Sequence, residues 1–484
     1  MSYKKEVITL IIVAAIFLCI NLLTGSKSPT VWQDEVAYSD PAINLVMEGK
    51  FTSTSWYTQS IDEFWAGNVP LHQFILAGWL QVFDISPTSV RAINYIYVII
   101  SVFCIWFFCY RKEIVDSSFF RILLVILLLC GYGISFSFRS GRPDMIGLLL
   151  FSVGLLSYLV KGQRKYISLF IISVLVPWAG LQFIPFLFLL ICILFLFDRN
   201  EFLKTAIATG SGSFLGGVLL IGLYSYNNVL DDFLDSIVPH TGTGDQTFLK
   251  LDQLVHIYGQ DYSYIALVFI VLAFYFYKIT RKKGLGFLST FKYCFIIAVI
   301  CPVFLHFSGK YPLYYTWMAY VPLCVGFLGE LSRHNLEKFQ QILVGITILC
   351  ISAIGLPART AVTAIQWEQR SYETVNELVS KSIISTDTVL TSYQGYYAAK
   401  NNSSEVLLPT LIFNSYTRID SSEAVNFNSI NKIIAEPGQL KKFKNKFNGN
   451  WRKIEETEKM IKSNSIFGIK LAKPYSLKVY KREN

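Results

Sequence analysis

VITLIIVAAIFLCINLLTGSKSPTVWQDEVAYSD (residues 7–40) joins a long apolar segment to a loop that carries aromatic and acidic side chains. Residues 7–23 contain no charged side chain. One helix needs about 17 to 25 mostly apolar residues to cross the hydrocarbon core of a bilayer. The segment therefore predicts a transmembrane helix. The alternative of a cleaved signal peptide is less favoured, because no small-residue cleavage site follows. Asp34 and Glu35 then stand where the chain leaves the membrane.

The same apolar pattern recurs along the chain of 484 residues, of which 53% are hydrophobic and 16% are charged. Soluble proteins of average composition carry about 25% charged residues. Further long apolar blocks occupy residues 90–110, 119–137, 144–160, 166–197, 202–223, 262–279, 290–307, 313–329 and 339–356. The block at 166–197 is long enough for two short spans around Pro177. The composition predicts an α-helical polytopic membrane protein and excludes a soluble globular one.

Basic clusters between these blocks set the orientation, because cytoplasmic loops carry an excess of Lys and Arg. We place the clusters at 111–112, 161–165, 281–283 and 333–338 in the cytoplasm, which leaves 29–89, 140–144, 225–262, 308–315 and the chain after 357 outside. This alternation gives about eleven spans. The apolar stretch at 70–83 is shorter than a span and suits an interfacial or re-entrant helix. We therefore expect about eleven to thirteen transmembrane helices. By analogy alone, the short cytoplasmic loops favour a bacterial inner (plasma) membrane.

The composition changes after Pro357, where apolar runs shorten and Lys, Asn, Ser and Glu become common. Helical spacing at 374–383 and strand-like runs at 387–393, 431–436 and 476–482 predict a small α/β domain. We divide the chain into a transmembrane domain, residues 1–356, with a large first outside loop at 25–89, and an extracytoplasmic domain, residues 357–484. All nine cysteines fall in apolar blocks, so neither a disulfide framework nor a CxxC metal site is expected.

Three polar stretches lie at the predicted outer ends of spans, where charged side chains are costly and are therefore candidates for function. They carry Asp34 and Glu35 in the first loop; Arg139, Arg142 and Asp144 at residues 138–147; and Lys310, Tyr314 and Tyr315 at residues 306–317. Neighbouring residues on a helix point about 100° apart, so Asp34 and Glu35 cannot serve one task from one direction. One of them can face a pocket while the other meets a metal, a lysine or water.

Carboxylates in one loop and cations in two others suit a transfer reaction. A carboxylate deprotonates an acceptor hydroxyl or amine, and the cations hold a phosphate leaving group. Each residue also has a purely structural alternative. The carboxylates can be loop charges, the arginines can be juxtamembrane anchors, and Lys310 can be a lysine that extends to the membrane surface.

The order of these motifs resembles the GT-C superfamily of membrane glycosyltransferases, in the branch that holds the protein mannosyltransferases and the bacterial aminoarabinose transferase of lipid A. The resemblance rests on WQDEVAYSDPAINLVMEGKF (32–51), NVPLHQFILAGWLQVFDISPTSVRAIN (68–94), SFRSGRPD (137–144) and SGKYPLYYTWMAYVPL (308–323). It covers residues 1–330, and the tail is similar only as an outside soluble domain.

The resemblance implies an inverting hexosyl- or pentosyltransferase that moves a sugar from a polyprenyl-phosphate donor to a glycan, lipid or protein acceptor on the outer face. Asp34 would be the general base, with Glu35 as its support and Asp144 as the second acidic residue. The donor phosphate would be bound by Lys310, Arg142, Arg91, Tyr314 and Tyr315. The resemblance allows a divalent cation, Mg²⁺ or Mn²⁺, at Asp34 and Asp144. It implies no nucleotide cofactor, and no nucleic acid is expected as a partner.

Two other function classes explain part of the same pattern. A transporter or flippase of lipid-linked saccharides would account for the spans and the basic sites, but transporters usually show repeated halves with broken helices at matching positions. A non-enzymatic partner in polymer assembly would instead depend mainly on the soluble tail. Neither alternative requires Asp34 and Asp144 to lie near one cavity, whereas the glycosyltransferase does.

Overall fold

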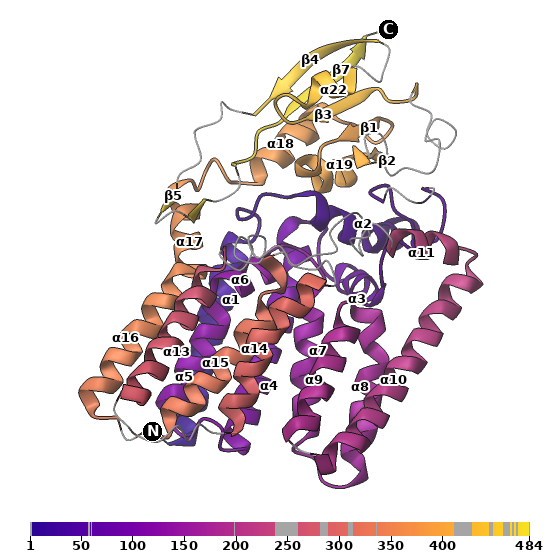
Figure 1. The fold of residues 1–484 in the computed structure, drawn as a ribbon. Helices are drawn as coiled ribbons and strands as arrows, with labels where there is room; N and C mark the ends of the chain where they lie inside the picture. The colour runs from indigo at the N-terminus through magenta and orange to yellow at the C-terminus, as the bar shows by residue number, and fades with distance from the viewer. Residues whose placement is uncertain are drawn as a thin grey trace.

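Helices form one thick layer in this computed structural model, and a five-stranded sheet caps one end of that layer (Figure 1). The structure describes residues 2–56, 59, 61–197, 199–237, 260–280, 289–307, 313–334, 336–410, 428–444, 449–457, 465–466, 469–470 and 473–483. The N-terminus lies at the end of the layer that is remote from the sheet (Figure 1).

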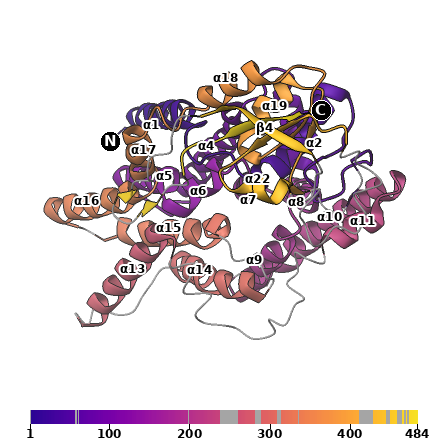
Figure 2. The ribbon, with the colours of Figure 1, turned by 90° about the horizontal axis from the view of Figure 1, so that it is seen from above.

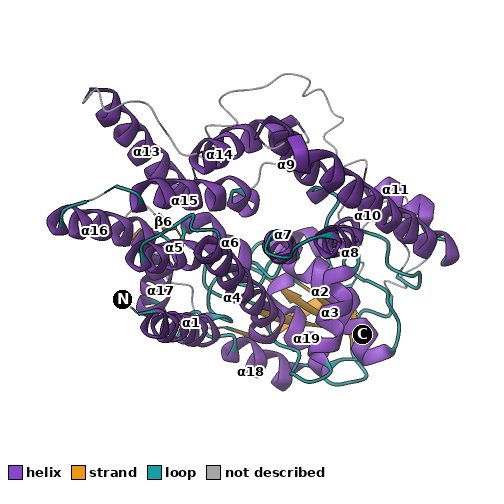
Figure 3. Cartoon of the chain, turned by 90° about the horizontal axis from the view of Figure 1, so that it is seen from below, coloured by secondary structure: helices purple, strands orange, loops and turns teal. Residues whose placement is uncertain are grey.

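The helical layer is built from elements of very different length. They are α1 (Tyr3–Thr24), α2 (Gln33–Glu48), α3 (Leu71–Leu80), α4 (Pro87–Arg111), α5 (Ser118–Cys130), α6 (Tyr132–Arg139), α7 (Asp144–Ser157), α8 (Gln163–Ala179), α9 (Phe183–Phe197), α10 (Arg199–Tyr226), α11 (Leu230–Ile237), α13 (Tyr262–Thr280), α14 (Ser289–Phe307), the 3₁₀ turn η2 (Leu313–Tyr315), α15 (Trp317–Ser332), α16 (Lys338–Ile354) and α17 (Leu356–Ile365). Seen from below, α4 and α7 lie between α1 and α8 (Figure 3).

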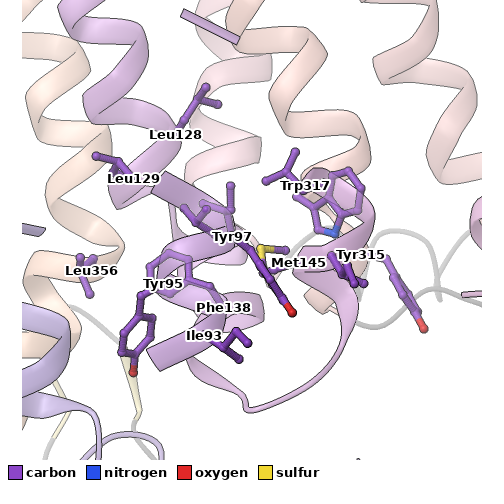
Figure 4. Close-up of a cluster of buried hydrophobic side chains, with 14 of the residues drawn as sticks. Ile93, Tyr95, Tyr97, Leu128, Leu129, Phe138, Met145, Tyr315, Trp317 and Leu356 are labelled. Atoms are coloured by element: carbon purple, nitrogen blue, oxygen red, sulfur yellow. The ribbon is translucent and has the colours of Figure 1, made fainter. Parts of the chain in front are cut away.

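The outer faces of these helices are apolar. Ile11, Ile12 and Ile16 of α1 are each more than half exposed, and Phe214 of α10 is 75% exposed. Apolar surface of this kind would be unfavourable in water, but it is the surface that lipid tails accept, because a helix satisfies its own backbone hydrogen bonds. The inner faces pack into a core that includes Tyr95, Phe138, Met145 and Trp317 (Figure 4). The prediction of a polytopic helical membrane protein is confirmed.

Length limits how many helices cross a bilayer unaided. Among the described helices, α1, α4 and α10 are long and apolar enough, and the number rises to five when the bent pairs α5–α6 and α16–α17 each count as one span. Shorter apolar helices occupy Leu71–Leu80, Asp144–Ser157, Phe183–Phe195, Tyr262–Phe276 and Phe291–Val303. The total of eleven to thirteen spans stays a prediction.

Glycines break two of the long apolar blocks and let the breaks touch. The chain bends by 51° between α5 and α6 and by 49° between α16 and α17. A Cβ added at Gly355 would lie 1.8 Å from the carbonyl oxygen of Cys130, and one at Gly131 would lie 2.7 Å from the ring of Tyr320. Only glycine permits such close backbone approach. The two bends therefore pack against one another and bring α6 beside α17.

The block at 166–197 also divides into two helices, as expected, although Pro177 is not the break. Pro177 lies inside α8, and the chain leaves the helix at Gly180 instead. A Cβ on Gly180 would come within 2.7 Å of the Phe183 ring, so this residue too permits a close approach.

The tail forms a small mixed sheet with helices on it, which confirms the predicted α/β class. Its elements are α18 (Glu373–Ser382), β1 (Thr388–Thr391), the 3₁₀ turn η3 (Tyr393–Gly395), α19 (Tyr396–Asn402), β2 (Glu405–Leu407), β3 (Lys432–Ala435), α22 (Gln439–Lys444), β4 (Asn450–Glu456), β5 (Ser465–Ile466), β6 (Ile469–Lys470) and β7 (Lys478–Glu483). The sheet order is β2-β1-β3-β7-β4, in which β1 pairs parallel with β2 and β3, and β7 pairs antiparallel with β3 and β4. The boundary predicted at residue 357 falls at the start of α17.

Helix α19 of the tail sits directly on α2, the helix that carries Asp34 and Glu35. Lys400 Nζ donates to Asn44 Oδ1 at 2.7 Å and to the Glu48 carboxylate at 3.1 Å. Tyr396 donates its hydroxyl hydrogen to Asp40. From above, the sheet lies over α2 and α7 and leaves α13 and α14 uncovered (Figure 2). The tail therefore covers one half of the helical layer, and that half contains the acidic loop.

Candidate active site

Helix α2 presents its two adjacent carboxylates to different surroundings. The helix begins at Gln33, so Asp34 and Glu35 lie in its first turn, where the helix dipole stabilises negative charge. The Asp34 side chain is 34% exposed, whereas the Glu35 side chain is completely buried. This matches the expectation that the two residues face different ways, and only Asp34 is accessible from outside the protein.

Glu35 forms a buried ion pair with Arg91 of α4. Arg91 Nε donates to Glu35 Oε1 at 2.8 Å, and Nη2 donates to the other carboxylate oxygen. Arg91 Nη1 donates to the carbonyl oxygens of Gly25 and Pro29, the latter at 2.8 Å. A two-point contact between a guanidinium and a carboxylate fixes both orientation and distance. Arg91 thus ties the start of α2 to the end of α1 and to α4.

Arg142 joins Asp34 to Asp144. Its Nη1 donates to Asp34 Oδ2, and its Nε donates to Asp144 Oδ2 at 2.8 Å. Asp144 is the first residue of α7 and is completely buried. The array therefore runs from a buried carboxylate through a buried guanidinium to the accessible carboxylate of Asp34.

The loop before α7 can reach this position because residue 141 is glycine. Gly141 has φ +69°, which is a left-handed conformation, and a Cβ there would lie 2.4 Å from Glu35 Cγ. Trp32 Nε1 donates to the Ser140 carbonyl oxygen at 2.9 Å, and Asn94 Nδ2 donates to the Arg142 carbonyl oxygen at 2.9 Å. Hydrogen bonds from two other segments therefore hold the loop backbone against α2.

Aromatic rings surround the Arg142 guanidinium. It lies 3.7 Å from the ring centre of Tyr314 and 5.0 Å from that of Tyr38. The Tyr315 ring contacts the Tyr314 ring at a centroid distance of 4.7 Å. Burial raises the pKa of Tyr38 to about 12, so its hydroxyl stays protonated and accepts a hydrogen bond from Asn68 Nδ2 at 3.0 Å. These rings provide stacking surface beside the carboxylates.

Two buried oxygen atoms of the site have no hydrogen-bond partner in the described structure. They are Asp144 Oδ1 and Asn94 Oδ1. A buried acceptor without a donor costs about 1–3 kcal/mol, so such atoms commonly mark the position of a ligand or a bound water. The site can therefore accept hydrogen bonds from hydroxyl or amine groups of a polar ligand.

The described residues do not fit a divalent cation between Asp34 and Asp144. No group of three or more His, Cys, Asp and Glu side chains in this part of the chain could hold a metal. The Arg142 guanidinium already bridges the two carboxylates. A cation at that position would displace it, and the neutralising charge is supplied by arginine instead.

The structure brings most of the predicted residues together but gives them two different positions. Asp34, Arg142, Asp144, Tyr314 and Tyr315 share one cluster, while Glu35 and Arg91 form a fully buried pair behind it. Lys310 lies outside the described residues. The assignment of Arg91 to the donor phosphate stays a prediction, and in this structure its guanidinium is engaged by Glu35 and two carbonyl oxygens.

Sequence reasoning missed two contributions. Tyr397 of the tail donates or accepts a hydrogen bond with Ser39 of α2 at 3.1 Å, and 358 residues separate the two in sequence. Arg359 of α17 stacks on Tyr132 and Phe136, close to Trp32 and Tyr314. Nothing in the local pattern shows the first contact. The second had a signal, because Arg359 is a charge placed directly after an apolar block.

Comparison with solved structures identifies the arrangement of helices. ArnT from Cupriavidus metallidurans, solved bound to undecaprenyl phosphate, superposes with a TM-score of 0.63 at 11% identity, over 99% of this chain and 98% of that one. Its apo structure gives the same TM-score. The chain has the GT-C fold. The Archaeoglobus fulgidus oligosaccharyltransferase has a TM-score of 0.53 at 11% identity, over 90% of this chain and 70% of that one.

The GT-C likeness is one of fold, because the identity to ArnT is only 11%. No protein-family model matches the chain, and no curated protein matches it. The superposition on ArnT extends over the tail as well as the helices, since 99% of this chain is covered. What the site of this GT-C chain does must therefore be argued from its own residues.

Proposed function

We propose that this protein is an inverting glycosyltransferase that moves a sugar from a polyprenyl-phosphate donor to an acceptor on the extracytoplasmic face of the membrane. The observation that carries the proposal is the Asp34–Arg142–Asp144 array, in which one carboxylate is accessible and the other two groups are buried. The GT-C fold supports it, because ArnT of the same fold was solved bound to undecaprenyl phosphate.

Asp34 is the proposed general base. As the acceptor oxygen or nitrogen forms a bond to C1 of the sugar, the proton of that group passes to the Asp34 carboxylate. The bond between C1 and the phosphate oxygen breaks on the opposite side, and its electron pair leaves with the phosphate. One displacement of this kind inverts the anomeric centre. Asp34 suits the role because its carboxylate is both anchored by Arg142 and open to an incoming acceptor.

The other residues hold this geometry or bind the substrates. Arg142 fixes the orientation of Asp34, and Asp144 fixes Arg142 while its free oxygen accepts a hydrogen bond from a sugar or acceptor group. Glu35 and Arg91 hold the first turn of α2 in place. Tyr314 and Tyr315 supply stacking surface. Lys310, which lies outside the described residues, remains the proposed phosphate ligand.

Replacing Asp34 by Asn tests the proposal. Asp34→Asn keeps the shape but cannot take a proton, so we expect sugar transfer to fall by about 100-fold or more. The measurement is transfer of radiolabelled sugar from a polyprenyl-phosphate donor to cell-envelope acceptors by the purified protein in nanodiscs. Asp62→Asn, an exposed carboxylate of the same loop, is the matched control and should retain wild-type turnover.

The competing transporter hypothesis makes a different prediction in the same system. A flippase would move the lipid-linked sugar between leaflets of a proteoliposome without forming a glycosylated product. Near-wild-type transfer by Asp34→Asn would remove the general base from the proposal. Translocation without any transfer by the wild type would replace the proposal with the flippase.

A further inference from the structure

Two of the described arginines at the site, Arg142 and Arg91, are paired with carboxylates that neutralise their charge. Arg142 faces the two carboxylates of Asp34 and Asp144, so this group of three carries a net charge of −1. Arg91 is paired with Glu35. A phosphate that leaves a polyprenyl-phosphate sugar bears a negative charge, and it would be repelled by a site that is already negative. Beside Lys310, which lies outside the described residues, a phosphate at this site needs a described cation that no carboxylate already pairs.

Arg139 does not supply it, because its N–H groups are already used. They donate to Asn21 Oδ1 at 2.6 Å, to the Thr24 carbonyl oxygen at 2.9 Å and to the Ser28 carbonyl oxygen at 2.6 Å. The Arg139 guanidinium thus fastens α6 to the end of α1. A ligand could reach it only by breaking these bonds.

Arg359 of α17 has donors to offer. Its side chain is 92% buried, since only 8% of the residue is exposed, yet Nε and Nη2 have no hydrogen-bond partner. Among the described residues no carboxylate forms an ion pair with its guanidinium within 4.0 Å, although the Asp261 charge acts on it from further away and the Tyr132 side chain lies against it. Asp261, which is in the same region, accepts instead from Thr316 Oγ1 at 2.6 Å and from the Tyr264 N–H at 3.1 Å. A buried charge without such partners is costly, and an anion would remove that cost.

A row of aromatic rings connects Arg359 to the candidate active site. The Arg359 guanidinium lies 4.3 Å from the ring centre of Tyr132 and 5.5 Å from that of Phe136. The Phe136 and Tyr314 rings are nearly parallel, at 11°, with centres 6.5 Å apart. Arg142 stacks on Tyr314 at 3.7 Å. Arg359 and Arg142 therefore lie at the two ends of the same row.

The helix breaks described above create this position. Tyr132 and Phe136 are four residues apart on α6 and so lie on one face of it. Arg359 is in the first turn of α17, which Gly355 allows to approach the start of α6. The two bends thus bring a cation that follows the last apolar block onto two rings of α6, the helix directly before α7.

We infer that Arg359 is an anion-binding residue whose unpaired N–H groups take the phosphate oxygens of the lipid carrier. This rests on the proposed function for the identity of the lipid, but the anion site itself rests on the geometry. A guanidinium matches phosphate because two parallel N–H groups meet two oxygens. A phospholipid headgroup carries the same chemistry, and the experiment must separate the two sources.

The test measures lipid binding to the purified full-length protein in nanodiscs made of zwitterionic lipid. Polyprenyl phosphate and phosphatidylglycerol are titrated separately against the wild type, Arg359→Gln and Arg359→Lys. Arg333→Gln is the matched control, because Arg333 is half-exposed at the opposite end of α15. We expect Arg359→Gln to weaken polyprenyl phosphate binding by about tenfold or more, Arg359→Lys to weaken it less, and Arg333→Gln to leave it unchanged.

Each outcome decides something. A loss confined to phosphatidylglycerol would keep the anion site and overturn its assignment to the carrier lipid. Unchanged binding of both lipids by a folded Arg359→Gln protein, shown by a wild-type melting temperature, would overturn the inference. Should Arg359→Gln fail to fold, hydrogen exchange decides in the wild type: polyprenyl phosphate should protect α6 and α17, and no protection would reject the site. If Asp34→Asn still transfers sugar while Arg359→Gln binds polyprenyl phosphate more weakly, only the role of Asp34 as general base is rejected and the anion site stands.

Discussion

At the residue scale, the site is built from short sequence motifs whose side chains bind partners that are far away in the sequence. The i, i+1 rule predicts that Asp34 and Glu35 face different ways, but not that Arg91 would be the partner of Glu35, because that contact spans 56 residues. Asp144 was predictable as a helix-starting carboxylate after Pro143. The contact of Arg142 with both Asp34 and Asp144 was not predictable, since a local motif does not determine the direction of a long flexible side chain.

Gly141 provides a residue-scale prediction with an internal control. Gly141→Ala forces a Cβ to within 2.4 Å of Glu35 Cγ and also places a non-glycine residue at φ +69°. Gly49→Ala, just after the C-terminal end of α2, imposes nearly the same φ, +70°, in a left-handed conformation with nothing within 4 Å. The shared backbone cost is about 1–2 kcal/mol. We expect sugar transfer to fall by about tenfold or more in Gly141→Ala only, because only that change shifts the start of α2. Equal activity in both variants would show that the approach to Glu35 does not matter.

At the element scale, hydrophobic blocks predict which segments are helices, and glycine decides where they bend. The blocks at 119–137 and 339–356 read as single spans in sequence, and the structure bends each of them, at Gly131 and at Gly355. The bends could not be predicted because glycine within an apolar helix is common and tolerated. Their consequence is visible only in three dimensions, where one break packs on the other. Of the strands in the tail, β1, β3 and β7 were predicted, because their short apolar runs are bounded by turn residues, whereas β2, β4, β5 and β6 were not.

The contact between α19 and α2 provides the element-scale prediction. Asp40 is completely buried and accepts hydrogen bonds from Tyr396, from Ser53 Oγ at 2.8 Å and from the Thr54 N–H at 2.6 Å. Tyr396→Phe removes one donor from a buried carboxylate, which costs about 1–3 kcal/mol of stability. We expect a lower melting temperature and a lower kcat with little change in KM for the donor, because α2 loses rigidity while the donor contacts remain. Tyr480→Phe on β7 is the control, and matching effects in both variants would assign the loss to the tail domain alone.

At the scale of the whole molecule, the elements that matter for function gather at one end. The acidic loop, α17 and the sheet lie at the end opposite the N-terminus, and α19 bears on α2 from that side (Figure 1). Sequence could supply the order of the spans and the tail, and the positive-inside rule could orient them. It could not show that the tail rests on α2, the helix that carries Asp34, because the residues in contact are separated by 352 to 358 positions.

The prediction at this scale concerns the side of the membrane on which the sheet end lies, which we expect to be the extracytoplasmic side. Single cysteines at Asp62 in the first loop and Glu377 in the tail should react with a membrane-impermeant maleimide in intact cells, because both residues are exposed at the sheet end. A cysteine at Arg333, which follows α15 at the other end, should react only after the membrane is opened. The native cysteines set the background, since all nine lie in apolar blocks. The opposite result would be that the cysteine at position 333 reacts in intact cells while those at positions 62 and 377 do not. It would place Asp34 and Arg359 on the cytoplasmic side and exclude an extracytoplasmic acceptor.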